Sequence, residues 1–362
     1  MSLSIADIGQ EVKVSYQPNK TDPLPYIGLE HVEPQSLQLL GFGSSTEVQS
    51  TKYRFEKGDI LFGVLRPYFK KLVVAPFAGV CSTEFCVIRP KNEGDRNYLF
   101  YLLAQDKFIE YATTNSVGAR PRTKWRLFSD YELKVHSDGV KSDIGALISN
   151  YDYLIQNNRR RIKLLEESGR LLYKEWFVCL RFPGHEHVGV ANGVPEGWRK
   201  KPIKEVFTLN YGKALTAGLR VPGVVPVYGS SGAIGSHNKP LVKAPGIIVG
   251  RKGNVGSIFW VYKDYWPIDT VYFVNSKESS LYLYHALQKL NFINTDVAVP
   301  GLNRDMAYSR EILIPIENIL SLFLEEVEPI QIQIEQLTEY NKKLAKARDI
   351  LLPRLMNGEL AV

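Results

Sequence analysis

The sequence predicts an α+β protein built from two globular units, each followed by a long amphipathic helix. Two long segments space their apolar residues alternately by three and four, which is the seam of a coiled coil. The two segments align at an offset of about 179 residues, which indicates an internal repeat. Short β-branched runs and helical periodicities precede each segment. We therefore divide the chain into globular units at 1–141 and 179–315 and helices at 142–178 and 316–362.

The seams define both helices. The first seam consists of Ile148, Tyr151, Ile155, Asn158, Ile162, Leu165, Gly169 and Leu172. The second consists of Leu320, Phe323, Val327, Ile330, Ile334, Leu337, Asn341, Leu344, Arg348 and Leu351. Charged residues cover the other faces, so each seam is expected to pack against one partner helix. The alternative, two unrelated core helices, is less favoured because such helices seldom sustain this alternation.

Three residues interrupt the helical pattern. Asn158 and Asn341 lie on the seams, where a buried amide lowers stability but can fix the register. Pro329 lacks an amide donor, so it is expected either to kink the second helix or to mark its actual start.

Each globular unit is predicted to mix strands with short helices. Strands are expected at 55–65, 72–75, 78–88 and 246–250, and helices at 97–111 and 279–292. Late in each unit, segments 117–122 and 299–304 correspond to each other, and each precedes a strand-like stretch, at 131–135 and 311–314. Loop-rich segments at 183–187 and 192–197 mark the joint between the units.

Composition restricts the class of protein. Lys and Arg number 45 against 38 Asp and Glu, a formal charge of +7, as expected of a protein that contacts phosphate. The three cysteines lack zinc-ligand spacing, which predicts a reducing compartment without disulfides or a metal site. No basic-then-apolar leader and no membrane-length apolar run is evident, so we expect a cytoplasmic protein.

Motifs for catalysis are missing from the sequence. There is no Asn/Asp-Pro-Pro-aromatic tetrad of an adenine methyltransferase, and the glycine-rich segment 250–256 lacks the Gly-Lys-Ser/Thr ending of a phosphate loop. His185 and His187 lie in the joint without a spaced ligand partner, so an exposed loop is favoured over a metal site. Cys81 and Cys86 are interpreted as inert, partly buried thiols. We predict no catalytic residue and no bound metal.

Polar loops in both units are candidates for contact with nucleic acid. Glycines let a backbone approach a ligand closely, and Arg, Lys, Asn, Ser and His side chains can meet base edges or phosphates. In the second unit the candidates are Ser230, Ser231, His237, Asn238, Arg251, Lys252, Asn254, Asn303 and Arg304. In the first unit, where basic residues alternate with aromatic ones, they are Arg66, Tyr68, Lys70, Lys71, Arg120, Arg122 and Lys124. The alternative interpretation is tight hairpins and ordinary exposed loops that carry solvated charges.

These motifs resemble a known family. Segments 227–235, 247–256 and 266–270 are similar to the target recognition domain of type I restriction-modification specificity subunits. Segments 57–61, 66–68 and 82–85 resemble the same domain in a different subclass. The stretches 170–177 and 351–360 look like the ends of the family's two conserved helices, although Pro329 departs from the usual helical pattern.

The resemblance implies an architecture and a set of partners. Two target recognition domains would each read half of a bipartite site in double-stranded DNA, while the helices pair as an antiparallel coiled coil that sets the gap. The chain itself would bind no cofactor. Two modification subunits, which bring S-adenosylmethionine and methylate adenine, would dock on the helices, and two nuclease/translocase subunits can join them. The candidate partner-binding residues on the helices are Arg159, Arg160, Tyr173, Trp176, Phe177, Lys342, Lys343, Arg354 and Leu355.

Two other functions compete with this one. In a type IIB-like system, one fused polypeptide carries both methylation and cleavage, and the chain would serve as its specificity subunit. From a different class, the chain could be a coiled-coil scaffold that joins proteins without reading DNA.

Overall fold

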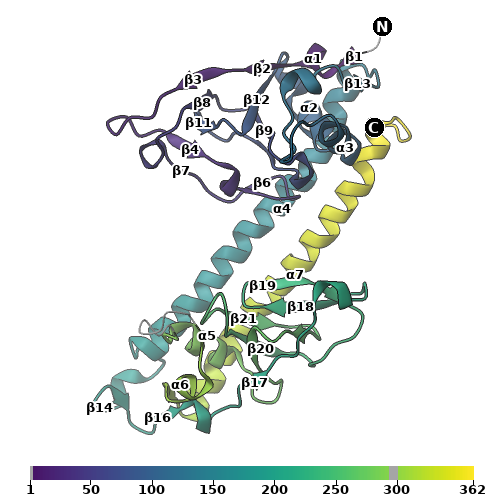
Figure 1. Ribbon diagram of the computed structural model, residues 1–362. Coiled ribbons are helices and arrows are strands. Elements are labelled where there is room, and N and C mark those ends of the chain that lie inside the picture. The colour runs from purple at the N-terminus through teal and green to yellow at the C-terminus, as the bar shows by residue number, and fades with distance from the viewer. Residues whose placement is uncertain (1–2, 293–300) are drawn as a thin grey trace. The chain divides into compact units, whose positions relative to one another are not determined.

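The computed structural model describes residues 3–292 and 301–362, which form two compact units (Figure 1). Unit 1 comprises Met1–Asn157 and Tyr340–Val362, and unit 2 comprises Asn158–Glu339. The two long helices, α4 (Asp138–Tyr173) and α7 (Glu317–Met356), each contribute a segment to both units. Residues from the two ends of the chain therefore belong to one unit.

Unit 1 contains two main sheets. One is antiparallel with the order β10-β9-β12-β2, and the other has the order β3-β8-β11-β4-β7 with β11 and β4 parallel. The strands are β1 (Leu3–Ser4), β2 (Gly9–Val12), β3 (Val14–Tyr16), β4 (Pro25–Ile27), β5 (Val32–Glu33), β6 (Gln38–Leu39), β7 (Gly43–Ser44), β8 (Lys52–Phe55), β9 (Ile60–Gly63), β10 (Leu72–Val74), β11 (Gly79–Ser82), β12 (Phe85–Pro90) and β13 (Glu132–Leu133).

Three elements expected to be continuous in unit 1 are divided, which corrects the sequence prediction. The strand expected at 55–65 is interrupted by a turn in which Gly58 has φ +93°, a left-handed conformation that favours glycine. The strand expected at 78–88 is likewise two strands, β11 and β12. The helix expected at 97–111 is two helices, α2 (Arg96–Leu103) and α3 (Asp106–Thr114), because Gln105 is extended with ψ 140°.

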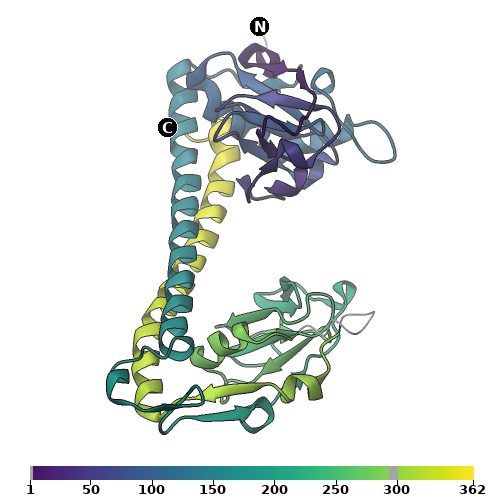
Figure 2. The same ribbon diagram turned by 90° about the vertical axis from the view of Figure 1, so that its left-hand side faces the viewer.

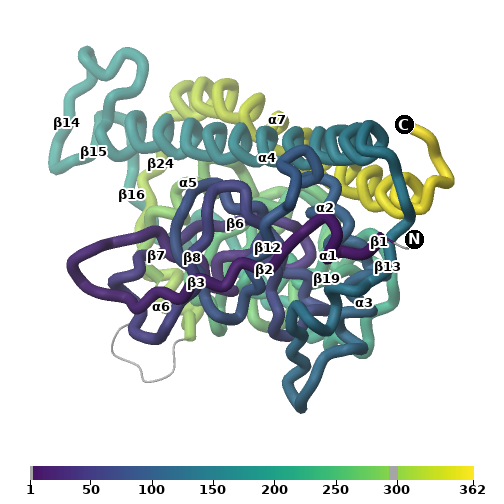
Figure 3. The backbone as a smooth tube through the Cα atoms, turned by 90° about the horizontal axis from the view of Figure 1, so that it is seen from above, coloured from purple at the N-terminus to yellow at the C-terminus, as the bar shows by residue number. Residues whose placement is uncertain are grey.

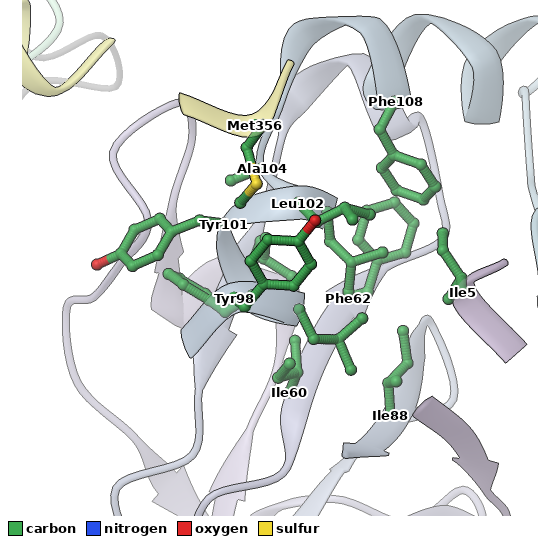
Figure 4. Packing of buried hydrophobic residues seen from close by; sticks show 14 of the residues in the cluster. Ile5, Ile60, Phe62, Ile88, Tyr98, Tyr101, Leu102, Ala104, Phe108 and Met356 are labelled. Atoms are coloured by element: carbon green, nitrogen blue, oxygen red, sulfur yellow. The ribbon is translucent and has the colours of Figure 1, made fainter. Parts of the chain in front are cut away.

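The largest core of unit 1 lies between the β9–β12 sheet, helices α2 and α3, and the two long helices (Figure 4). Phe62, Phe108 and Phe128 pack edge to face with one another, with ring centroids 5.4–5.6 Å apart. Such a pair stabilises by about 0.5–1.5 kcal/mol beyond the area it buries. The short helix α1 (Ile5–Ile8) adds Ile5 to this core, and α7 adds Met356.

Unit 2 has its own sheets. The larger one has the order β17-β23-β20-β21, and a second has the order β19-β18-β22. The strands are β14 (Val190–Ala191), β15 (Val194–Pro195), β16 (Arg199–Pro202), β17 (Asn210–Tyr211), β18 (Val225–Gly229), β19 (Gly232–His237), β20 (Gly246–Gly250), β21 (Ile258–Val261), β22 (Trp266–Pro267), β23 (Val271–Val274) and β24 (Glu311–Ile314). The strands predicted at 246–250 and 311–314 are confirmed.

In unit 2, the larger sheet and the short helices share one core with the two long helices (Figure 2). Helix α5 (Leu281–Lys289) begins where the Ser280 hydroxyl accepts a hydrogen bond from the Leu283 amide, and this confirms the helix predicted at 279–292. Helix α6 (Arg304–Tyr308) precedes β24. The paired strands β14 and β15 project beyond the end of α4 (Figure 3).

Both predicted seams are confirmed, because each of their residues is buried or half-buried. Helix α7 begins at Glu317, so the alternative that Pro329 marks its start is wrong. The first turns of α7 are held by Ile319 and Phe323, which are buried in the core of unit 2, while Pro329 is exposed.

The helices run antiparallel within each unit. In unit 1, Nε2 of His136, just before α4, lies 3.0 Å from the carbonyl oxygen of Met356 at the end of α7. Asp152, further along α4, pairs with Arg348, which precedes Met356 on α7. In unit 2, a Cβ on Gly169 would lie 3.5 Å from Val327, and the Tyr173 ring lies 6.1 Å from that of Phe323. Later positions on α4 thus meet earlier positions on α7.

Arg348 is the charged member of the second seam, and the structure shows how unit 1 accommodates it. The side chains of Arg348 and Asp152 are 6% and 11% exposed and form an ion pair. Tyr101 on α2 donates a hydrogen bond of 2.6 Å to the same carboxylate, and Asp349 accepts a second bond from the guanidinium. The network links α2, α4 and α7, and of its groups Arg348, Asp152 and Tyr101 are buried while Asp349 is exposed.

Replacing Arg348 should be costly because it leaves the Asp152 carboxylate buried without its counter-charge. We expect Arg348→Met to lower the free energy of unfolding by about 3–5 kcal/mol. The double variant Arg348→Met/Asp152→Leu should regain most of this, since no buried charge remains. Urea unfolding measures both, with the exposed Lys346→Met as the matched control. A single variant as stable as the control would contradict the role given to this pair.

Candidate nucleic-acid interface

In unit 2, the segment that follows β20 carries the first group of candidate residues. The backbone amides of Arg251 and Lys252 both donate to the Thr270 carbonyl, at 2.9 and 3.1 Å, and the Arg251 carbonyl accepts from the Leu302 amide at 2.8 Å. Gly250 is required at the start of this segment, because a Cβ there would lie 2.1 Å from the Asn254 carbonyl oxygen. The backbone is therefore fixed where the two basic side chains leave it.

Two of the predicted arginines share one aromatic ring. The guanidinium carbons of Arg251 and Arg304 lie over the Tyr211 ring, 5.0 and 5.2 Å from its centroid. Tyr211 is 50% exposed and ends β17. Among residues 3–292 and 301–362, no carboxylate forms an ion pair with either arginine or with Lys252. The cluster thus presents uncompensated positive charge on an aromatic surface.

A buried tyrosine supports this cluster from below. Tyr272 on β23 packs its ring 5.1 Å from that of Tyr211 and donates a hydrogen bond to the Leu302 carbonyl. Burial raises the pKa of Tyr272, so its hydroxyl stays protonated and remains a donor. The segment that leads to Arg304 is thereby tied to the strand beneath Arg251.

The structure places other predicted residues of unit 2 in structural positions. Ser230 is buried, and its hydroxyl accepts from the Asn254 amide, which joins the two glycine-rich loops. His237 is also buried and accepts from the Val221 amide. Asn303 caps α6 by accepting from the Asp305 amide.

The remaining predicted side chains of unit 2 are exposed. They are Ser231, Asn238, Lys252 and Asn254. Of the repeated segment 299–304, positions 299 and 300 lie outside the described residues. Tyr211 was not among the residues predicted from the sequence. It precedes Gly212 and Lys213, so it follows the same aromatic-basic pattern that indicated the candidates in unit 1.

In unit 1, the two basic segments predicted separately lie against each other. The Arg66 amide donates to the Pro121 carbonyl at 2.7 Å, and the Thr123 amide donates to the Val64 carbonyl. Val117 and Arg122 exchange backbone hydrogen bonds, which places Arg120 near the tip of a hairpin. One surface therefore carries residues from both segments.

The turn at Pro67–Phe69 directs two aromatic rings outward. Arg66 and Lys70, on either side of it, have φ of +52° and +50°, a conformation that costs a non-glycine residue about 1–3 kcal/mol. Tyr68 and Phe69 are 42% and 40% exposed, and their rings pack 4.8 Å apart. Strain and exposed aromatic surface at one turn are typical of a contact site.

Not all basic groups of unit 1 are available to a ligand. Lys70 pairs with Asp106 at 2.9 Å, and Arg122 pairs with Glu84. The Lys71 ammonium donates to the Leu29 carbonyl at 2.5 Å. In the described part of the chain, no ion pair involves the three remaining basic candidates, which are Arg66, Arg120 and Lys124.

The candidate partner-binding residues on the helices divide by burial. Tyr173, Phe177 and Leu355 are at most 6% exposed and pack inside the core of their own unit, so they do not offer their side chains to a partner here. Trp176 is half-buried against the same core as Tyr173. The charged candidates are exposed, namely Arg159, Arg160, Lys342, Lys343 and Arg354.

The described residues include no cluster of metal ligands, and two of the three cysteines are buried. Between 3 and 292 and from 301 onward, no cluster of three His, Cys, Asp or Glu side chains could hold a metal ion. Burial raises the pKa of the Cys81 and Cys86 thiols, which keeps both protonated, while Cys179 is exposed. In the same ranges, no helix is long and apolar enough to cross a membrane.

Comparison with protein families identifies the repeated unit. The family model described as "Type I restriction modification DNA specificity domain" matches the chain twice, at residues 17–167 and 195–342. The two matches together cover more than half of the sequence.

Individual relatives agree with this family match. The type I restriction enzyme MjaIX specificity subunit of Methanocaldococcus jannaschii is 24% identical over 341 residues, covering 85% of this chain and 79% of the relative. The HindI specificity subunit of Haemophilus influenzae is 23% identical over 406 residues, covering 85% and 88%. The crystal structure of a type I S subunit from M. genitalium matches 98% of this chain and 96% of its own, with 15% identity and a TM-score of 0.60, which shows a shared fold.

Proposed function

The chain belongs to the family of type I restriction-modification DNA specificity subunits, and from this premise we propose that it reads a bipartite DNA target, one half-site per unit. The observation that carries the proposal is the double occurrence of the family's DNA specificity domain. Each copy holds a different exposed set of basic and aromatic residues, so the two half-sites should differ in sequence. The protein is the non-catalytic recognition subunit of its complex.

In unit 2 we assign the reading of one half-site to the Arg251–Tyr211–Arg304 cluster. A guanidinium can fork onto O6 and N7 of guanine or bind a phosphate bidentately. The Tyr211 ring and the backbone bonds around Arg251 hold the groups in place before binding, which reduces the entropy lost on association. Lys252 is suited to phosphate and Asn254 to adenine.

In unit 1 we assign the other half-site to the surface formed by the two joined loops. Arg66, Arg120 and Lys124 would neutralise phosphates or meet bases, while the exposed rings of Tyr68 and Phe69 provide apolar contact. Lys70 and Arg122, which are paired with acidic residues, would instead fix the conformation of these loops.

We further propose how the chain works with its partners. Two modification subunits bring S-adenosylmethionine and methylate adenine, and two restriction subunits can complete a cytoplasmic complex. The exposed charged residues on α4 and α7 are the proposed docking points. Helix α4 has 36 residues, so it is about 54 Å long, which exceeds the roughly 34–36 Å of one DNA turn. We assign to these helices the role of setting the gap between half-sites.

The relatives reported above are type I subunits, which favours this function over a specificity subunit with a fused partner. The basic residues without ion pairs in both units argue against the alternative that the chain is a scaffold that does not bind DNA. Binding to one DNA sequence with strong salt dependence is the measurement that separates a reader from a scaffold.

Lengthening both helices should change the gap and nothing else. A heptad inserted in α4 after Asn157 and in α7 after Glu339 preserves the seam, and it adds about 10 Å, or roughly three base pairs. Methylome sequencing of cells that also express the partner subunits should show a longer gap between unchanged half-sites. Seven residues inserted at the exposed Asn192–Gly193 turn are the control. A changed half-site would refute the division of labour.

Removing the Arg251 side chain should affect the half-site read by unit 2. If Arg251 contacts a base, Arg251→Ala should cost about 1–3 kcal/mol of binding and relax the sequence at one position. If it contacts phosphate, affinity should fall uniformly and the salt dependence should weaken. Titration of the assembled complex with target and substituted duplexes separates these results. Arg199→Ala, at an exposed position on β16, serves as the control, and an equal response of both variants would remove Arg251 from the interface.

A further inference from the structure

Unit 2 contains a cavity of about 580 Å³ between α4, α7, α5 and β21. Gly169, His285 and Val327 line its buried floor. Lys163 and Glu166 lie on its exposed rim. The DNA-contact cluster described above does not use any of these residues.

The internal repeat identifies the counterpart of this cavity in unit 1. The offset of about 179 residues that aligns the two seams places Gly169 on Arg348 and Gln331 on Asp152. Aligning Tyr282–His285 of α5 with Tyr98–Tyr101 of α2 places His285 on Tyr101. Each member of the buried Arg348 network therefore has a counterpart that lines the cavity.

Unit 1 fills this position with its own arginine, whereas unit 2 does not. Arg348 is buried against the Asp152 carboxylate, which also accepts from Tyr101. Gly169 offers no side chain, and a Cβ there would already lie 3.3 Å from Cε1 and Nε2 of His285. By this alignment, the cavity lies beside the position in unit 2 that corresponds to Arg348 in unit 1.

One residue in the wall of this cavity carries a buried polar atom without a partner. Nδ1 of His285 is buried and has no hydrogen-bond partner, and the residue is 7% exposed. Burial lowers the pKa of His285 to about 4, so the ring is neutral at pH 7. Leaving such a polar atom unpaired costs about 1–3 kcal/mol.

The surrounding groups favour a planar cation. Trp260 and Tyr284 line the cavity with aromatic rings, and such faces attract guanidinium groups. Glu335 accepts hydrogen bonds from Trp260 and Gln331 at 3.3 and 3.1 Å. A carboxylate therefore contacts two of the residues that line the cavity.

Charge at the rim is mixed but leaves one acidic group uncompensated. In the residues that the structure describes, Glu166 forms no ion pair, while Arg170 is held by Glu167. Lys163 is the other cation on the rim.

We propose that this cavity binds the guanidinium of an arginine presented by a partner polypeptide, which supplies to unit 2 what Arg348 supplies to unit 1. The cavity and its chemistry stand independently, and only the identity of the partner, a modification subunit docked on the helices, rests on the proposed function. The two units would then differ in the source of the arginine beside their paired helices. Unit 1 uses Arg348 of the same chain, and unit 2 receives an arginine from the partner when the complex assembles.

The first experiment uses a small probe on the full chain. Nα-acetylarginine methylamide is titrated against protein labelled with 5-fluorotryptophan, and the Trp260 resonance is assigned from Trp260→Phe. The arginine probe should shift this resonance, and the neutral isostere Nα-acetylcitrulline methylamide should not. Gln331→Asp, which installs the carboxylate that Asp152 supplies in unit 1, should tighten binding about tenfold. Gly169→Arg should abolish binding, and the exposed Ser168→Arg should not.

The second experiment tests the partner. Light scattering of the co-expressed complex should show loss of a modification subunit with Gly169→Arg and full assembly with Ser168→Arg. Equal response to both probes, or a Gln331→Asp variant that binds arginine no better, would overturn the proposal even if Gly169→Arg fails to fold. Probe binding with unaffected assembly would assign the cavity to a free guanidinium compound instead. DNA binding by the same variants, measured separately, reports on the proposed function alone.

Discussion

The antiparallel packing of α4 against α7 is the contact on which both globular units depend. Unit 1 closes its core with Ile144 and Ile148 from α4 and Leu352 from α7, and unit 2 uses Tyr173 and Phe323 in the same way. Short strands of two to six residues cannot bury enough apolar surface by themselves. Because residues near the C-terminus complete the N-terminal unit, neither unit can reach its final packing before both helices are in place.

The polar groups on this packed surface make the two halves of the repeat different. A buried charge network costs desolvation energy but specifies one register, and unit 1 has such a network in Arg348, Asp152 and Tyr101. Unit 2 has Gly169 and Gln331 at the matching positions and is left with a cavity. The two copies therefore share most apolar positions of the seam and differ in chemistry at the seam position of Gly169 and Arg348, and at the neighbouring position of Gln331 and Asp152. The same difference extends to the proposed DNA faces, where a strained aromatic turn in unit 1 contrasts with two arginines that share one ring in unit 2.

Both proposed DNA faces depend on loops that are fixed by backbone hydrogen bonds to neighbouring strands. The Arg251 segment is held by Thr270, and the hairpin that carries Arg120 is held through Pro121 and Arg66. Fixed loops present cations whose conformational entropy is already reduced, which favours selective binding over general attraction to phosphate. Under the proposed function, the partner subunits carry out methylation, and the contribution of this chain is precise placement on DNA.

The sequence by itself determined the helices, their seams and the order of units, because periodicity is local and reports directly which face of an element is apolar. It also located the basic segments, including Arg251 and Arg304. The tertiary structure alone decided which of these residues meet. Tyr211 lies under both arginines only because β17 pairs with β23, and β23 with β20, and such long-range pairing leaves no local pattern in the sequence. For the same reason, burial of Ser230 and His237, and the joining of the two basic segments of unit 1, required the folded chain.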